Sequence, residues 1–276
     1  MKNRNAAESV AENYYDSSDA DIFYERVWGG EDIHIGLYES GLSIFEASRK
    51  TVELMATTLI TLDENSRVLD LGAGYGGAAR YLAEKYGCQV TCLNLSETQN
   101  ERNRLLNKEH NLANKISVLH GSFENVPCDN SSFDIVWSQD AFLHSGDRPQ
   151  ILQEIDRVLT TGGEIIFTDP MQIDSCDTDA LQPVYDRLDL ESLSSPGFYQ
   201  AYFGKLGFKA LSSNILTDQL GVHYSAVRQQ ILDRYEELVV DISPAYLNKM
   251  ITGLQSWINA KEAEQLVWGV LHYKRQ

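Results

Sequence analysis

Long apolar segments are missing from this chain of 276 residues. No apolar run reaches the ~18 residues that a membrane-spanning helix needs. Residues 1–10 are polar and lack the hydrophobic part of a signal peptide. The sequence therefore predicts neither a membrane anchor nor export, and we expect a protein of the reducing cytoplasm.

Cysteine is scarce, with four residues, and none of them forms a recognisable ligand pair. Cys88 and Cys92 flank a predicted strand, whereas Cys128 and Cys176 have no nearby partner in the sequence. The six histidines show no ligand spacing with carboxylates or thiols. We expect small buried thiols rather than disulfides, and no metal centre.

Positive charge is also in short supply, because 23 Lys and Arg stand against 40 Asp and Glu, a net charge of −17. Such a surface repels phosphate backbones and anionic lipid heads. Nucleic acid and membranes are therefore poor candidate partners. The hydrophobic content of 43 % is ample for a packed core, which argues against a disordered chain.

An alternation of strand and helix patterns runs through the middle of the chain. It predicts an α/β fold with a mostly parallel, doubly wound sheet. The expected strands are 67–71, 89–93, 116–120, 133–138 and 164–168, with later ones near 209–216 and 266–273. The expected helices between them are 77–86, 97–110 and 148–159.

The chain divides by pattern into four parts. Residues 1–62 are expected to form an N-terminal lid and helix, beginning as a loose arm over 1–20, with a short helix over 22–30 and an amphipathic one over 41–62. The other parts are a cofactor-binding core over 63–173, an inserted cap segment over 174–203, and the remainder of the core over 204–276, with a helical cap over 222–261.

A glycine-rich loop, Asp70-Leu-Gly-Ala-Gly-Tyr-Gly-Gly77, follows the first predicted strand. Gly72 and Gly74 lack Cβ atoms where a ligand would touch the backbone. Dinucleotide-binding folds use a similar loop, and a plain strand–helix turn is a further alternative. Asp70 favours another ligand, because its carboxylate would repel a pyrophosphate but suits the cationic ammonium and sulfonium of S-adenosylmethionine.

The run Val68–Gly77 resembles the first motif of class I S-adenosylmethionine-dependent methyltransferases. The resemblance implies a Rossmann-like fold, S-adenosylmethionine as the donor, and cofactor contacts from Asp70, Gly72, Ala73 and Gly74. Methyltransferases of this class usually carry an acid at the end of the second strand, where this chain has Asn94, so a bidentate grip on the ribose is in doubt. Further contacts are expected from Leu95, Gln99 and Gln139.

The segment Gly121-Ser-Phe-Glu-Asn-Val-Pro127 resembles the adenine-contacting segment of the same class. The resemblance implies that Ser122 meets the exocyclic amine and that Phe123 stacks on the ring. A plain loop is the alternative for each residue.

Ser138-Gln-Asp-Ala-Phe-Leu-His144 ends the fourth predicted strand. Methyl transfer is an in-line displacement, so the enzyme mainly positions the nucleophile and excludes water. Asp140 and His144 are four residues apart and would share one face of a helical turn. We expect both in the active site, whereas Trp137 is interpreted as core packing.

Asp140 and His144 also resemble an aspartate and a histidine of small-molecule amine N-methyltransferases, among them phosphoethanolamine and sarcosine/dimethylglycine methyltransferases. In the phosphoethanolamine enzymes the histidine pairs with a tyrosine of the N-terminal helix and closes a lid. The resemblance implies that His144 has such a partner. By position Tyr24 is the best match, with Tyr14 and Tyr15 as rivals.

The segment 14–38 resembles dimethylglycine methyltransferases that make the osmoprotectant glycine betaine, and Trp268-Gly269 matches too. The resemblance implies a small zwitterionic amine as acceptor. Its carboxylate needs a cation, for which Arg187 is the first choice and Arg26 and Arg49 are alternatives. Aromatic faces would stabilise the cationic product, or else serve as core or lid residues: Tyr24, Trp28, Tyr38 and Phe142.

Other functions are open at this point. The acceptor could be a phosphoethanolamine-like amine, or a lipid or quinone methylated on carbon or oxygen. A non-catalytic S-adenosylmethionine-binding regulator is a different class, which the Asp140 and His144 pair disfavours. We expect a monomer or a weak homo-oligomer.

Overall fold

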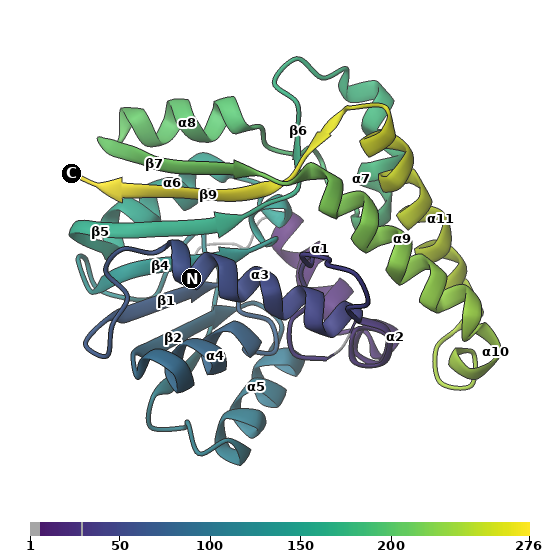
Figure 1. Ribbon diagram of the computed structural model, residues 1–276, viewed down its shortest axis with the longest axis horizontal. Coiled ribbons are helices and arrows are strands. Elements are labelled where there is room, and N and C mark those ends of the chain that lie inside the picture. Colours follow the sequence, from purple (N-terminus) through teal and green to yellow (C-terminus); the bar gives the residue numbers. More distant parts are fainter. Residues whose placement is uncertain (1–5, 29) are drawn as a thin grey trace.

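A seven-stranded sheet forms the centre of the computed structural model, which describes residues 6–28 and 30–276 (Figure 1). Its order is β3-β2-β1-β4-β5-β9-β7. The pairs from β3 to β5 are parallel, and β9 runs antiparallel to both of its neighbours. The strands are β1 (Arg67–Leu71), β2 (Gln89–Asn94), β3 (Ile116–His120), β4 (Phe133–Gln139), β5 (Leu159–Thr168), β7 (Phe208–Ile215) and β9 (Gly269–Arg275).

The predicted strands agree with the observed ones to within a residue or two, except at β5 and at the last one, where 266–273 was expected but β9 begins at Gly269, after the separate short strand β8 (Leu266–Val267). Central strands of a parallel sheet are buried on both faces and therefore show as short apolar runs. β5 begins at Leu159 rather than at the expected Glu164, because the chain continues through Gly162 (φ +78°) and pairs with β4 across a register shift. The mostly parallel α/β fold is confirmed.

Helices cover both faces of the sheet. On one face α3 (Ile44–Thr58) and α4 (Gly77–Tyr86) pack on residues such as Val68 and Trp137. On the other, α6 (Arg148–Val158) and α8 (Pro196–Lys205) pack on Leu69 and Phe167. α5 (Glu97–Glu109) contacts β2 and β3. Alternate residues of a strand point to opposite faces, and two separate cores result.

A third core lies beyond the carboxyl ends of the parallel strands, at the right of Figure 1. α11 (Pro244–Glu262) packs there against α9 (Thr217–Asp233) and α7 (Gln182–Leu188). Short elements complete this region: η3 (Thr178–Leu181), α10 (Tyr235–Leu238) and the two-stranded β6 (Met171–Gln172) and β8 (Leu266–Val267). We call this region the cap. α8 contacts α6 and β7 instead, although the expected inserted segment 174–203 includes most of it.

The N-terminal segment is helical where the sequence suggested a loose arm. α1 (Ala6–Tyr15) is followed by α2 (Ser18–Phe23), which Ser17 caps by accepting a hydrogen bond from Ala20 N, and by the π-helical η1 (Tyr24–Trp28). The expected loose arm is therefore wrong for residues 6–20, and its first five residues lie outside the described part. Gly29, expected with Gly30 to end this segment, lies outside it too.

α3 is shorter than the expected helix over 41–62. Ser43 and Glu46 form a capping box that begins the helix at Ile44, and extended backbone at Leu59 ends it. Within the described ranges, no helix combines the length and apolar character needed to cross a membrane. Cys88 and Cys92 are free and buried, as expected of small core thiols.

Candidate active site

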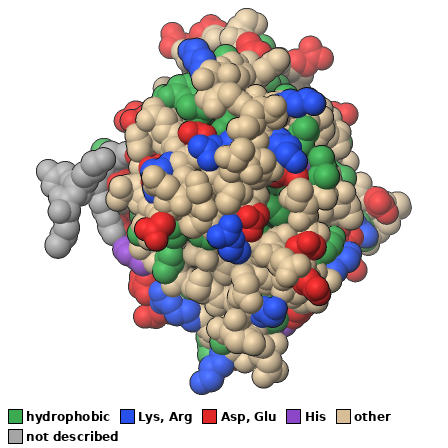
Figure 2. Space-filling view, turned by 90° about the vertical axis from the view of Figure 1, so that its left-hand side faces the viewer, with side chains coloured by type: hydrophobic (Ala, Val, Ile, Leu, Met, Phe, Trp, Pro, Cys, Tyr) green, Lys and Arg blue, Asp and Glu red, His purple; other side chains and the backbone are tan. Residues whose placement is uncertain are grey.

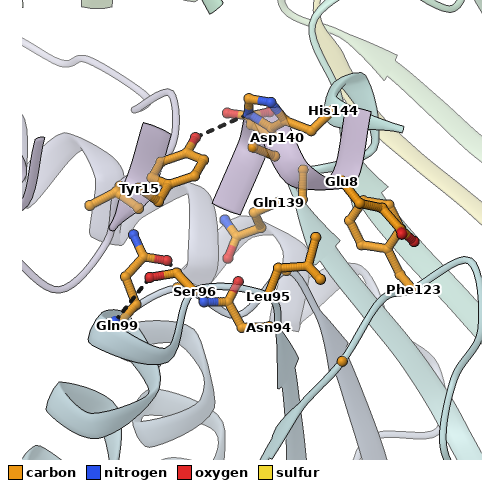
Figure 3. A pocket seen from close by; sticks show the side chains of 16 residues that line it. Glu8, Tyr15, Asn94, Leu95, Ser96, Gln99, Phe123, Gln139, Asp140 and His144 are labelled. Carbon is orange, nitrogen blue, oxygen red and sulfur yellow. Dashed lines mark hydrogen bonds between the residues drawn. The ribbon is translucent and has the colours of Figure 1, made fainter. Parts of the chain in front are cut away.

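A pocket opens at the carboxyl ends of β1, β2 and β4, with α1 on its outer side (Figure 3). Ligands of open α/β sheets bind at this edge. Both expected acceptor-site residues of β4 and the turn after it, Asp140 and His144, lie in its wall. Most of the predicted cofactor residues line it too: Gly72, Gly74, Asn94, Leu95, Gln99, Phe123 and Gln139.

Gly72 shows why the loop needs glycine. Its φ is +76°, which side-chain-bearing residues rarely adopt, and an added Cβ would lie 2.4 Å from Ala141 Cβ. The loop after β1 therefore packs directly against the turn that follows β4. The Gly72 N–H also donates to Leu93 O at 2.8 Å, which ties the loop to β2.

Asp70 and Ala73 line an adjoining small pocket that shares Gly72 and Gln139 with the first. Burial raises the pKa of Asp70 to about 7; the neighbouring His34 opposes this rise and Asp32 adds to it. A cationic ligand would return Asp70 to its ionised form. The site therefore suits the ammonium and sulfonium groups of S-adenosylmethionine.

Asn94 and Gln99 form a pair at the end of β2. Asn94 Nδ2 donates to Gln99 Oε1 at 2.9 Å, which leaves Asn94 Oδ1 for another donor. Gln99 Nε2 is buried and has no hydrogen-bond partner among the described residues. The pair thus offers one acceptor and one donor side by side, at the position where the resemblance of the first motif led us to expect a carboxylate.

Ser122 does not line the pocket, contrary to expectation. Its hydroxyl accepts from Glu124 N at 3.0 Å within its own turn, and Gly121 and Phe123 form the wall there. Ser96 also lines the pocket, although no motif in the sequence singled it out. It is the N-cap residue of α5. Its hydroxyl donates to Asp16 at 2.6 Å and connects α5 to the chain after α1.

Asp140 does not stand on a regular helical turn with His144, as the spacing suggested. Its φ of +49° breaks the helical path, and only the short 3-10 helix η2 (Phe142–His144) follows. Its carboxylate accepts from Ile35 N at 2.7 Å and from Trp268 Nε1 at 2.8 Å. Asp140 therefore joins the end of β4 to two distant segments while still lining the pocket.

The residue that pairs with His144 is Tyr15, not Tyr24. Tyr15 Oη lies 3.0 Å from His144 Nε2 (Figure 3), whereas Tyr24 Oη is 3.3 Å from Tyr14 Oη. The choice of Tyr24 was wrong because α1, rather than the later π-helical turn, packs against η2. Burial, together with the charges of Arg187 and Arg148, lowers the pKa of His144 to about 4.

Arg187 is the predicted arginine that keeps free donors. It is 3 % exposed, and its Nε and Nη1 atoms have no hydrogen-bond partner among the described residues. Its Cζ lies 5.1 Å from the ring centroid of Tyr224. α11 makes room for it with Gly253, where a Cβ would lie 2.7 Å from Arg187 Cγ.

The two alternative arginines are engaged elsewhere. Arg26 pairs with Asp241 at 2.6 Å, and both side chains are well exposed. Arg49 pairs with Asp32 at 2.8 Å and donates to Gly77 O at 3.2 Å. Neither presents unused donors to the pocket at the end of β4.

The comparisons with known proteins agree with this geometry. A family model described as a methyltransferase domain matches residues 69–167. The sarcosine/dimethylglycine N-methyltransferase of Halorhodospira halochloris is 49 % identical over 267 residues, 96 % of each chain. That of Aphanothece halophytica is 46 % identical over 276 residues, the whole of both chains.

This chain belongs to the sarcosine/dimethylglycine N-methyltransferase family. A crystal structure assigned to a sarcosine dimethylglycine methyltransferase from Galdieria sulphuraria superposes with a TM-score of 0.90 at 42 % identity, covering 95 % of this chain and 99 % of that one. Phosphoethanolamine N-methyltransferase 2 of Haemonchus contortus has a TM-score of 0.84 at 17 % identity and covers 100 % of this chain and 61 % of its own; it shares the fold.

Membership confirms that the chain is an S-adenosylmethionine-dependent methyltransferase, as its first motif predicts. The pocket fits that donor substrate, because buried polar atoms at its edge lack partners in the described part of the chain: Gln99 Nε2 and Gln139 Nε2. In the same ranges, no three His, Cys, Asp or Glu side chains converge as metal ligands do.

The aromatic residues expected at the acceptor separate into two groups. Trp28 and Tyr38 surround His223, with the Trp28 ring 4.9 Å away and Tyr38 Oη 2.9 Å from His223 Nδ1. Phe142 packs into the sheet core against Phe167 at 5.3 Å, so it does not face the acceptor. Trp137 is fully buried in the core, which confirms its interpretation.

Residues 31–38, which we call the strap, belong to the segment 14–38 that the resemblance singled out, but only Tyr38 among them was expected in the site. Asp32, Ile33 and His34 line the two pockets, and the Ile35 N–H binds Asp140. The strap lies so close to the cofactor loop that a Cβ on Gly77 would lie 2.2 Å from Asp32 Oδ1. No periodic pattern marks it, because its order comes from contacts with distant elements.

Proposed function

We propose that this enzyme methylates sarcosine and dimethylglycine, in the direction of glycine betaine, with S-adenosylmethionine as donor. The observation that carries the proposal is the burial of Arg187 without partners for all of its donors. In a chain of net charge −17, this arginine is a cation buried in the cap, and two of its nitrogens have no hydrogen-bond partner among the described residues. Relatives named for these substrates match over nearly the full length at 44–49 % identity.

In this proposal Arg187 holds the acceptor carboxylate. A hydrogen bond to a charged group in a water-poor site contributes about 1.5–3 kcal/mol, and a guanidinium suits a carboxylate because its donors lie in one plane. The charge of Arg187 also lowers the pKa of His144, so the two groups lie near enough to interact. A small amino acid can therefore place its carboxylate at Arg187 and its nitrogen toward His144.

The nitrogen end of the acceptor would lie near Asp140 and His144. The donor substrate supplies an electrophilic methyl group when it is bound. The acceptor nitrogen attacks with its lone pair, so its proton must leave first. With a pKa of about 4, His144 is uncharged at neutral pH and does not repel the trimethylammonium product.

Aromatic faces complete the proposed acceptor chamber. The ring of Tyr24 contacts those of Trp28 and Tyr15, with centroid distances of 5.3 Å and 5.7 Å. Each face that meets a methylated ammonium can contribute about 0.5–2 kcal/mol. Tyr38 would act indirectly, through its hydrogen bond to His223.

α1 is the proposed lid. Its Tyr15 reaches His144 across the pocket, and a closed lid excludes water from the transfer. We further propose that residues 1–62 form the lid unit, that 63–173 bind the donor, and that the cap holds the acceptor. A cytoplasmic monomer or weak homo-oligomer acting on a small amine fits the acidic composition.

The test is product formation from methyl-labelled S-adenosylmethionine, followed by mass spectrometry. The purified chain receives sarcosine, dimethylglycine, phosphoethanolamine and a quinone in separate reactions. We expect labelled dimethylglycine and labelled betaine from the first two. Intact donor binding by calorimetry, with no methylation of either amino acid, would overturn the proposal.

Arg187→Met and Arg187→Lys form a matched pair for the carboxylate contact. We expect Arg187→Met to raise the KM for dimethylglycine about 10–100-fold, since bonds worth about 1.5–3 kcal/mol are lost. Arg187→Lys keeps the charge and should lose less. The KM for S-adenosylmethionine should change less than twofold in both, and an unchanged acceptor KM in Arg187→Met would contradict the assignment.

A further inference from the structure

His223 of α9 is a fully buried histidine whose tautomer can be assigned from its contacts. The backbone N–H of Gly36 lies 3.1 Å from its Nδ1, and Tyr38 Oη lies 2.9 Å from the same atom. A backbone N–H can only donate, so Nδ1 accepts and carries no proton. The ring proton of neutral His223 must therefore be on Nε2.

The Nε2–H of His223 has no hydrogen-bond partner among the described residues, although the side chain is fully buried. Buried donors are nearly always paired, so an unpaired one in a native protein calls for a ligand or a water. The strap holds the other side of the ring in a fixed orientation. The free donor is consequently aimed in one direction.

His223 and Arg187 both contact Tyr224, the residue that follows His223 in α9. The His223 ring lies 5.9 Å from the ring of Tyr224, and Arg187 Cζ lies 5.1 Å from the centroid of that ring. Burial lowers the pKa of His223, and the charges of His34 and Arg187 lower it further. Two buried groups with unused donors thus lie around Tyr224, one of them charged and one neutral.

We propose that the Nε2–H of His223 is a second hydrogen-bond donor to the acceptor carboxylate, next to Arg187. The inference rests on the proposed function and makes it more specific. A carboxylate has two oxygens that can accept several bonds, so one guanidinium does not saturate it. A neutral donor adds such a bond without adding positive charge beside the cationic product. His223 would therefore make the enzyme prefer amines that carry a carboxylate.

Tyr38 and Gly36 acquire a role in this arrangement. They belong to the strap, which also binds Asp140 through Ile35 N and lines the donor pocket through Ile33. Their two hydrogen bonds keep the proton of His223 on Nε2. Ordering of the strap would thus assemble the donor side and the acceptor side of the site together.

A matched pair of variants separates this binding role from a purely structural one. The amide of His223→Asn can keep an acceptor near the position of Nδ1 but has no atom at Nε2. The amide of His223→Gln reaches the Nε2 position with a donor but loses the acceptor that the strap uses. We compare kcat and KM for dimethylglycine, for S-adenosylmethionine and for N,N-dimethylethanolamine, an acceptor without a carboxylate.

We expect His223→Asn to raise the KM for dimethylglycine about tenfold or more, with kcat and the KM for S-adenosylmethionine within twofold of wild type. Turnover of N,N-dimethylethanolamine should be equal in the two proteins. His223→Gln should recover part of the lost acceptor affinity. An unchanged KM for dimethylglycine in folded His223→Asn, or an equal loss on both acceptors, would overturn the proposal.

The wild-type protein provides a measurement that needs no active variant. With 15N-labelled histidine, we expect the Nε2–H signal of His223 to shift when dimethylglycine is added, and not when N,N-dimethylethanolamine is added. A signal that dimethylglycine leaves unmoved would refute the contact. Failure of the wild type to methylate sarcosine or dimethylglycine is a separate result, which concerns the proposed function alone.

Discussion

Tyr15 and His144 form an uncharged pair in the wall of the pocket. Burial raises the pKa of the Tyr15 hydroxyl far above neutrality, and burial lowers that of His144 to about 4. Neither group changes its charge over the pH range of ordinary enzymology. Their contact can therefore hold the lid without adding a charge next to the reacting amine.

Tyr15→Phe should lower kcat for dimethylglycine about 2–10-fold, because one hydrogen bond contributes about 0.5–1.5 kcal/mol. Tyr235→Phe is the matched control, since its hydroxyl donates to Asn248 and its side chain does not line the pocket. Steady-state kinetics give kcat, and calorimetry gives the dissociation constant of S-adenosylmethionine, which should stay within twofold. Equal loss of kcat in both variants would argue against a specific role for Tyr15.

The raised pKa of Asp70 leads us to expect that the affinity for S-adenosylmethionine depends on pH. Its pKa of about 7 means that it is largely protonated at pH 6 before the ligand binds, and only the ionised form attracts the cationic donor. The dissociation constant of S-adenosylmethionine should fall as the pH rises from 6 to 8. Asp70→Asn should bind more weakly, and the pH dependence left in that variant is the part due to other groups, including the ligand. Equal slopes in both proteins would contradict the prediction.

At the scale of elements, α1 is the largest departure from expectation. Glu8, Ala11 and Tyr15 follow one another at intervals of three and four residues, so they share one face of the helix, and all three line the pocket. The segment suggested an arm because most of its apolar residues are alanine or tyrosine and Val10 is its only large aliphatic residue. The helix is ordered by the pocket and the cap rather than by its own propensity.

Ala11→Pro tests whether the helical form of α1 matters for turnover. Proline inside a helix costs about 3 kcal/mol, so we expect kcat to fall at least tenfold. The thermal unfolding midpoint of the sheet core should change by only a few degrees, because α1 lies outside it. Ser18→Pro is the control, since Ser18 is the first residue of α2 after the N-cap Ser17, a position that tolerates proline. An active Ala11→Pro enzyme would exclude α1 as an essential lid.

At the scale of the whole molecule, 40 Asp and Glu stand against 23 Lys and Arg. On the face in Figure 2, acidic and basic side chains are scattered among hydrophobic and polar ones. Some of the basic residues form surface ion pairs with carboxylates, as Arg67 does with Asp134. The net charge of −17 nevertheless opposes the compact state through self-repulsion.

Added salt should therefore stabilise the folded enzyme. Screening becomes effective at separations beyond about 10 Å at 0.1 M salt, so sodium chloride from ~0.02 to ~0.5 M should raise the thermal unfolding midpoint by a few degrees. A neutral solute at equal osmolality serves as the control. If the neutral solute raised the midpoint as much as salt did, the effect would not be electrostatic.

The sequence alone determined the sheet, the donor and the family. Val68–Gly77 is one contiguous strand and loop, and the other central strands are apolar runs, so their signals are local and can be recognised without contacts. The position of Asn94 at the end of β2, facing the donor pocket, follows in the same way.

Only the tertiary structure decided which residues complete the acceptor side. Tyr15 rather than Tyr24 meets His144, 129 positions away, and Gly36 meets His223 across 187 positions. Whether an arginine has free donors likewise depends on its neighbours in space. Arg26 and Arg49 form ion pairs with Asp241 and Asp32, whereas two nitrogens of Arg187 have no partner among the described residues. Such contacts arise when the lid, the strap and the cap pack over the sheet edge, and no local pattern of residues encodes them.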